Sequence, residues 1–452
     1  MAAGHSHAHG PHLDSAVTVG TRARLGLLIV LALAAAATLF GLVRYWPDEA
    51  RTADSVAATD FAAPGVTFPA GTVAKVLPVC PTTPADEESG TGTGEPGEPT
   101  EEGKTCGAIT VTLDAARAGS ARSTVTVSVP PAITRSGLQA GDQVQLMRVP
   151  PQEGAPEAYS FLQVQRGAPL IALAVLFLIV VAVVARLRGL LALVGLAFGG
   201  FILIAFMLPA LLEGRSGLVV ASVGSSAIMF VVLYLAHGLS IRTSTALAGT
   251  LFGVAITAVL GIAGVGVARL SGVANDEAAT LASFVQHMSP RELLTAAIIV
   301  AGLGVLNDVT ITQSSAVWEL RGAAPQMTRM ELFRSGMRIG RDHIASTIYT
   351  IVFAYAGAAL PVLMLLFLYE RPVFDLLQTE SLAEEIVRTL ASAIGLVLAV
   401  PATTAIAALT VSGAEPAPGH RPSTVLTSRA STGTTIDRPP MTRAEARARH
   451  RT

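Results

Sequence analysis

Long apolar runs with almost no charged residues dominate this sequence and leave few folds open to it. Each run has roughly 17 to 25 residues, the length that an α-helix needs to cross about 30 Å of hydrocarbon. Only 14% of the residues are charged, whereas soluble globular proteins carry about 25%. So few charged residues could not cover the surface of a soluble protein, and the sequence therefore predicts an integral membrane protein.

About eight such runs follow one another along the chain, and each is expected to form a transmembrane helix. The first is an anchor, and the others form a helical domain of about seven spans over residues 169–411. The expected spans are 25–43, 169–185, 190–212, 218–235, 244–268, 293–317, 345–369 and 386–411. The predicted fold class is a membrane all-α helical bundle.

The first apolar run admits two interpretations, a secretory signal peptide or a retained anchor. It has about 19 residues, whereas the core of a signal peptide has about 7 to 15. Arg44-Tyr45-Trp46-Pro47 follow it, where a cleavage site would need small residues. We therefore expect an anchor, preceded by a disordered cytoplasmic tail over residues 1–24.

Basic and acidic residues alternate between successive connections, which predicts the topology. One set of connections holds Arg186, Arg188, Arg242, Arg321, Arg329, Arg334, Arg338 and Arg341. The other set holds Glu213, Asp276, Glu277, Asp375, Glu380, Glu384 and Glu385. Cytoplasmic loops carry an excess of Lys and Arg, so both termini are expected in the cytoplasm. The last segment, 412–452, is rich in Pro, Ser, Thr and Arg and is expected to be a disordered tail.

Between the anchor and the remaining runs, residues 63–166 follow a strand pattern. Val and Thr alternate in segments such as 108–113 and 123–127, with the period of two residues that strands show. About five short strands are expected, which suits a small barrel-like domain of the OB or SH3 type. The predicted topology places this β domain outside the cytoplasm.

The chain has 2 cysteines, Cys80 and Cys106, and both fall in the β domain. Disulfides persist outside the cytoplasm, so we expect the two residues to pair. Two unpaired thiols are the alternative. Residues 81–105 between them are rich in Gly, Pro, Thr and Glu, a composition typical of a disordered acidic insert.

An aspartate inside the expected span 293–317 is the sharpest chemical signal. Asp308 lies about 22 Å from the start of that span, and a carboxylate at such a depth costs about 2.5 kcal/mol or more. Oxygen ligands suit a hard monovalent cation, and a carboxylate can accept a proton. Alternatively, Asp308 caps a broken or re-entrant helix. The candidate site is Asp308 with Asn307, Thr310, Thr312, Gln313 and Ser314.

A second polar cluster opens the next span, with Asp342, His343 and Ser346 as its members. Asp342 and Ser346 share one helix face because they are four residues apart. The simpler interpretation is an interfacial helix start, where a negative charge is stabilised by the helix dipole. We favour that interpretation.

Other motifs carry weaker signals. His5, His7, His9 and His12 could bind Zn²⁺, Ni²⁺ or Cu²⁺, although a flexible tail offers no fixed geometry. Gly224-Ser225-Ser226-Ala227 is similar to the nucleophile motif of intramembrane serine proteases, but Ala227 stands where glycine belongs. The sequence holds no phosphate-binding loop and no metalloprotease motif. We therefore expect no enzyme activity, no cofactor and no nucleic-acid partner.

Two stretches resemble a known family. They are Gly302-Leu303-Gly304-Val305-Leu306-Asn307-Asp308-Val309-Thr310, and Gly340-Arg341-Asp342-His343 leading to Tyr355-Ala356-Gly357-Ala358-Ala359-Leu360-Pro361. Both look like the YibE/F-like bacterial membrane proteins, and the likeness covers roughly residues 66 to 411. The resemblance implies a multi-pass protein of the bacterial cytoplasmic membrane, and it implies no substrate.

Two functions from different classes follow from these features. The first is an ion-coupled or facilitative permease in which Asp308 binds a monovalent cation or a proton. The second is a non-transporting envelope protein whose β domain binds a partner or a cell-wall component. An intramembrane protease built on Ser225 and Ser226 ranks third. Besides the lipid bilayer, the expected partners are therefore an ion and, in the second case, an envelope component.

Overall fold

The structure is a computed structural model, and it describes residues 17–48, 65–78, 107–113, 124–151, 156–285, 287–368 and 372–412. Several predicted features lie outside the described residues. They are the histidines His5, His7, His9 and His12, the cysteines Cys80 and Cys106, the insert 81–105 and the tail beyond residue 412.

The β domain is a five-stranded antiparallel sheet, as its alternating pattern predicts. The strands are β1 (Ala70–Val76), β2 (Ala108–Leu113), β3 (Thr124–Ser128), β4 (Gln143–Val149) and β5 (Ala158–Val164), with a short helix α4 (Pro131–Arg135) before β4. Their order is β3-β2-β1-β4-β5, and the edge strands β3 and β5 also contact each other. The sheet therefore curls until it is nearly closed.

Alternation along each strand builds the core of the β domain. In β2, Ile109, Val111 and Leu113 are buried, while Thr110 and Thr112 between them are partly exposed. Val144 and Leu146 of β4 fill the same core. The period of two residues thus sorts apolar and polar side chains onto opposite faces.

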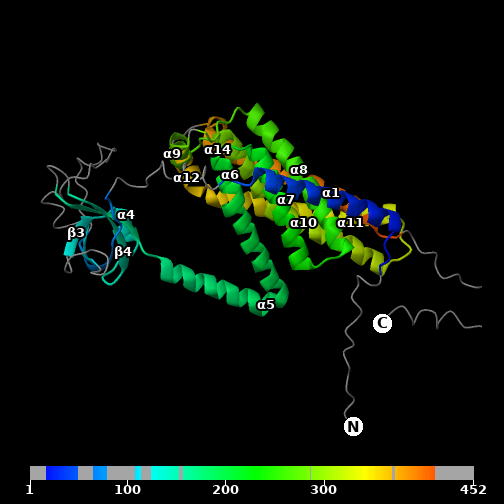
Figure 1. Cartoon of the computed structure of the whole chain (residues 1–452), viewed down its shortest axis with the longest axis horizontal. Helices are drawn as coiled ribbons and strands as arrows, with labels where there is room; N and C mark the ends of the chain where they lie inside the picture. The colour runs from blue at the N-terminus through cyan, green and yellow to red at the C-terminus, as the bar shows by residue number, and fades with distance from the viewer. Residues whose placement is uncertain are drawn as a thin grey trace, which may run out of the picture.

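The rest of the described chain is helical (Figure 1). The elements are α1 (Thr21–Tyr45), α5 (Gly167–Ile202), a π-helical turn η3 (Leu203–Met207), α6 (Leu208–Leu212), α7 (Gly217–His237), α8 (Ile241–Val267), α9 (Asp276–Phe284), α10 (Pro290–Ala323), α11 (Arg329–Ala358), α12 (Leu360–Leu368), α13 (Val373–Leu377) and α14 (Glu380–Thr410). Within the described residues, six helical stretches are long and apolar enough to cross a membrane. They are α1, the stretch Gly167–Leu212, α7, α8, α10 and α14.

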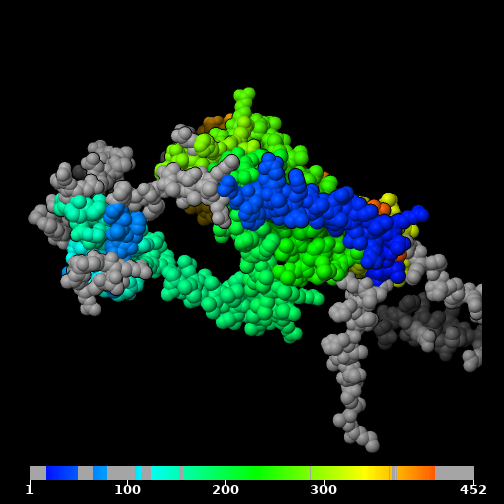
Figure 2. Space-filling view, viewed as in Figure 1, coloured from blue at the N-terminus to red at the C-terminus, as the bar shows by residue number. Residues whose placement is uncertain are grey.

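The stretch Gly167–Leu212 contains the two predicted spans 169–185 and 190–212 in one bent helix. The bend lies at Arg186, which has φ 53° and ψ −140°, far from helical values. Figure 1 shows the resulting turn between the two arms of α5, and Figure 2 shows that the first arm stands clear of the bundle. Its apolar side chains, such as Leu170 and Val184, are therefore exposed.

Helices α8, α10 and α14 form the centre of the bundle, and glycines allow them to approach closely. A Cβ atom on Gly253 of α8 would lie 2.5 Å from Leu306 of α10. A Cβ atom on Gly249 of α8 would lie 1.9 Å from Thr403 of α14. Small residues play this role in membrane bundles, where close packing replaces the hydrophobic effect between helices.

Backbone hydrogen bonds join the start of α1 to the end of α14. Gly20 N donates to Thr410 O at 3.1 Å, and Ser412 N donates to Thr18 O at 2.8 Å. Val19 and Val411 form an antiparallel bridge. Both ends of the helical bundle therefore lie on one side of it, and Figure 1 shows the β domain at the opposite side.

Candidate functional site

Helix α10 carries the predicted site around Asp308, and it is continuous there. It begins after the cap residue Ser289, whose side chain accepts from Glu292 N, and it runs unbroken from Pro290 to Ala323. The alternative interpretation, in which Asp308 caps a broken or re-entrant helix, is therefore wrong. The polar residues 307–315 break the apolar character of the sequence, but the helical backbone continues through them.

Three of the predicted site residues point into the bundle and are buried. Thr310 Oγ1 lies 2.6 Å from Thr250 Oγ1 of α8. Gln313 Nε2 donates to Gly336 O of α11 at 2.8 Å and to Thr404 Oγ1 of α14 at 2.7 Å. Ser314 Oγ donates to Arg242 O at 2.8 Å. These residues therefore connect α10 to α8, α11 and α14.

The other predicted residues lie on the outer side of α10. Asp308 and Thr312 are exposed, and Asn307 is half-buried. Thr312 Oγ1 lies 3.3 Å from Nε2 of His343 on α11, so the structure brings the two predicted clusters together. Asp342 and Ser346 of α11 are exposed as well. The predicted site around Asp308 is thus divided between an inner and an outer face of α10.

A line of buried polar residues runs through the centre of the bundle, and sequence reasoning found only part of it. We call it the polar seam and define it as Glu384, Ser392, Thr257, Thr403, Thr250, Thr310, Gln313 and Thr404. Its members come from α8, α10 and α14. The signal in the sequence was weak, because single Ser and Thr residues in apolar helices are common and usually bond to their own backbone.

Two hydroxyl groups of the polar seam lie where α8, α10 and α14 meet. Thr257 is 0% exposed and Ser392 is 2% exposed, and neither side chain has a hydrogen-bond partner among the described residues. A Cβ atom on Gly395 would lie 2.1 Å from Thr257 Oγ1, and one on Gly302 would lie 3.6 Å from Ser392 Oγ. A buried polar group without a partner costs about 1–3 kcal/mol.

Glu384 ends the polar seam near the connection between α8 and α9. The charge pattern placed Glu384 in a loop, whereas α14 begins at Glu380 and buries Glu384 in its second turn. One turn earlier, Glu380 Oε1 accepts from Ser271 N at 2.5 Å and from Ser271 Oγ at 2.9 Å. These contacts hold the α8–α9 connection over the end of α14.

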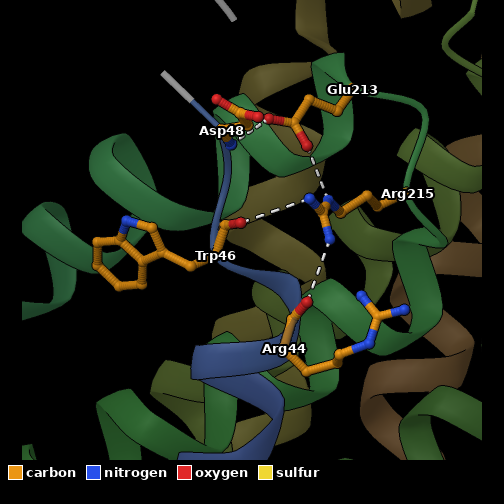
Figure 3. A network of polar contacts seen from close by, with 5 residues as sticks. All are labelled: Arg44, Trp46, Asp48, Glu213 and Arg215. Atoms are coloured by element: carbon orange, nitrogen blue, oxygen red, sulfur yellow. Dashed lines mark hydrogen bonds and ion pairs between the residues drawn. The ribbon is translucent and has the colours of Figure 1, made fainter. Parts of the chain in front are cut away.

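A separate polar network fixes the end of α1, where the chain leaves for the β domain (Figure 3). Arg215 donates to Arg44 O at 3.3 Å, to Trp46 O at 3.4 Å and to Glu213 Oε2 at 2.8 Å. Asp48 N donates to Glu213 Oε1 at 2.5 Å. The last carbonyl groups of a helix lack partners within it, so Arg215 supplies donors that α1 needs.

Comparison with known proteins gives one match. Residues 173–413 match the family model described as YibE/F-like protein. No curated protein and no solved structure matches the chain. The match covers the helical bundle from the first arm of α5 to the end of α14, including the polar seam, and it begins after the β domain.

Proposed function

Because the chain belongs to the YibE/F-like protein family, we propose that it is an ion-coupled or facilitative permease of the bacterial cytoplasmic membrane. In this proposal the chain crosses the membrane about eight times. The spans are α1, the two arms of Gly167–Leu212, α7, α8, α10, the part of α11 from residue 345 together with α12, and α14. Both termini are cytoplasmic, and the β domain, an OB- or SH3-type barrel, lies outside.

The polar seam is the observation that carries the proposal. A bundle that only anchors a domain can be held together by small and apolar residues. Here eight buried polar residues line the three central helices, from Glu384 at one end of α14 to Thr404 near the other. Polar side chains inside membranes mark the pathways of ions and substrates.

Asp308 supplies an ionisable group at membrane depth on the outer side of α10. Ser314, six residues later, bonds to Arg242 at the start of α8, so Asp308 lies about 9 Å deeper than that level. An exposed carboxylate in hydrocarbon costs about 2.5 kcal/mol or more. We propose that Asp308 binds the coupling cation or proton, with the Thr312–His343 pair beside it.

Thermal unfolding of the detergent-purified protein tests this role without knowledge of the substrate. The protein is heated in Na⁺, K⁺ or Li⁺ at constant ionic strength and over a range of pH, as wild type and as Asp308→Asn. A ligand that binds only the folded state stabilises it by RT ln(1 + [L]/Kd), so we expect an ion- or pH-specific rise in Tm that Asp308→Asn removes.

Glu319→Gln is the matched control, because Glu319 is an exposed carboxylate on the same helix, about 16 Å beyond Asp308. It is expected to keep the wild-type response. An identical response of wild type and Asp308→Asn to every ion and pH would refute the role of Asp308.

The second function remains a non-transporting envelope protein, and the network around Arg215 favours it. A permease does not need the end of α1, where the chain leaves for a folded β domain, to be fixed to the bundle by three hydrogen bonds. Deletion of residues 63–165 separates the two functions. Loss of the cellular phenotype with unchanged ion-dependent stability supports partner binding, whereas a retained phenotype supports the permease.

A further inference from the structure

The outer end of the polar seam has the features of a cation site. We infer that Glu384 binds a monovalent cation there, between the start of α14 and the connection from α8 to α9. This inference rests on the proposed function and deepens it. It assigns ion binding to Glu384, the one carboxylate of the polar seam, at the end of the seam where α14 begins.

Burial and an unsatisfied oxygen single out Glu384. Glu384 is 7% exposed, and its Oε1 atom has no hydrogen-bond partner among the described residues. The backbone N–H of Gly272 interacts with the carboxylate. Gly272 itself has φ +81°, and a Cβ atom there would lie 2.4 Å from Pro290 O, so the loop is closely packed over this end.

The surrounding charges favour a cation. Glu380, Glu385 and Arg388 are close enough to Glu384 to act on it electrostatically. Of these groups Arg388 is the one cation, and it forms an ion pair with Glu385. Three carboxylates therefore share one guanidinium, which leaves the site negative.

A purely structural role does not account for the free oxygen atom. Glu380 already holds the α8–α9 connection, because its Oε1 accepts from both donors of Ser271. Glu384 points at the same connection but leaves Oε1 unpaired within the described residues. A buried carboxylate oxygen in that position is stabilised by a bound cation, as paired buried charges are.

The coordination number favours a monovalent ion. Within the described residues, no group of three His, Cys, Asp or Glu side chains could hold a metal ion. Ca²⁺ needs about six to eight oxygen ligands, and Mg²⁺ needs near-ideal octahedral geometry. Ser392, eight residues later on α14, lies about 12 Å further along the helix, which is too far to bind the same ion.

The experiment measures Tm of the full-length protein in detergent, in NaCl, KCl or LiCl against choline chloride at equal ionic strength. Wild type is expected to unfold at a higher temperature with at least one alkali cation, in a saturable way. Glu384→Gln keeps the size of the side chain and an acceptor for Gly272, yet it is expected to lose this rise. Glu319→Gln, which removes an exposed carboxylate of α10 far from this site, is the matched control and is expected to keep it.

Three results would overturn the inference. They are an unchanged cation response in Glu384→Gln, equal stability of wild type in all four salts, and a response of wild type to pH alone that Glu384→Gln removes. The last result would assign Glu384 as a proton acceptor instead. If Glu384→Gln does not yield folded protein, Glu384→Asp replaces it, and half-saturation is then expected at several-fold higher cation concentration; an unchanged value overturns the inference.

Cation flux into proteoliposomes distinguishes this inference from the proposed function. Flux by wild type that Glu384→Gln does not alter would leave the permease standing and remove the role of Glu384. Conversely, a cation-dependent Tm that needs Glu384, in a protein without any flux, would keep the site and refute the permease.

Discussion

Thr250 and Thr310 face each other across the centre of the bundle, with their hydroxyl oxygens 2.6 Å apart. Each hydroxyl also lies within reach of its own helix, Thr250 Oγ1 at 3.0 Å from Ala246 O and Thr310 Oγ1 at 2.9 Å from Leu306 O. The contact between α8 and α10 is therefore one hydrogen bond in a network, and removing one partner leaves the other a backbone acceptor.

A double-mutant cycle measures the strength of that contact. Thr250→Val and Thr310→Val keep the shape of each side chain and remove its hydroxyl. We expect a coupling of about 0.6 kcal/mol, the average for such bonds in membrane proteins, and at most about 1.7 kcal/mol. Unfolding free energies in detergent of both single variants and the double variant give the value. Strict additivity would contradict the contact.

Gly395 leaves space for Thr257 at the crossing of α8 and α14. A Cβ atom on Gly395 would lie 2.1 Å from Thr257 Oγ1, so Gly395→Ala is expected to destabilise the protein by about 1–3 kcal/mol through overpacking. The double variant Gly395→Ala with Thr257→Ala removes the clashing hydroxyl and is expected to recover part of the loss. Thermal unfolding in detergent measures both effects.

Gly304→Ala is the matched control, since nothing lies within 4 Å of a Cβ atom there. Alanine is favoured over glycine inside a helix by about 0.5–1 kcal/mol, so this variant is expected to be as stable as wild type or more stable. Equal destabilisation of Gly304→Ala and Gly395→Ala would contradict the packing argument.

Arg215 is expected to hold the last turn of α1 closed. Arg215→Gln loses the donors to Arg44 O and Trp46 O, so amide hydrogen exchange over residues 41–48 should become faster, while exchange in α8 and α10 stays unchanged. Arg166→Gln, an exposed arginine before α5, serves as the control. The ring centroid of Trp46 lies 5.8 Å from that of Phe206. Unaltered exchange at the end of α1 would show that this contact is enough to hold the last turn of α1 without Arg215.

The start of α11 predicts a pH dependence. Thr328 and Glu331 form a capping box, and hydrogen bonds from the backbone and side chain of Thr328 lower the pKa of Glu331. A lowered folded-state pKa stabilises the protein above the ordinary pKa of a glutamate, and this contribution is lost as the pH falls through the lower folded value. Tm differences between wild type and Glu331→Gln, measured from pH 7 down to pH 3, should therefore shrink with acidification. A constant difference would contradict this account.

The membrane class and the strands of the β domain could be predicted from the sequence because both depend on local periodicity. Runs such as 244–268 are long enough to span a bilayer, and alternation in 108–113 sorts side chains to two faces. The sequence alone does not distinguish a bend at Arg186 from a loop, because two short spans joined by a loop and one bent helix have the same hydropathy pattern.

The site was harder to predict because burial depends on neighbouring helices. Asp308 and Gln313 are both polar residues of one apolar helix, yet Asp308 is exposed and Gln313 is buried against α11 and α14. For Glu384 the sequence predicts a loop, because acidic residues are typical of connections. Its burial results from the α8–α9 connection, which is distant in sequence.

The bridge between Val19 and Val411 brings the start of the first helix next to the end of the last helix. A bundle whose first and last helices meet in this way is suited to circular permutation, because a short peptide can join residues near Val19 and Val411 while new ends open at a surface turn. Figure 1 shows α9, which precedes the turn to α10, at the side of the bundle opposite the joined ends. A permuted protein of that kind would present its new ends beside the β domain, which makes that side directly accessible to labels and fusions.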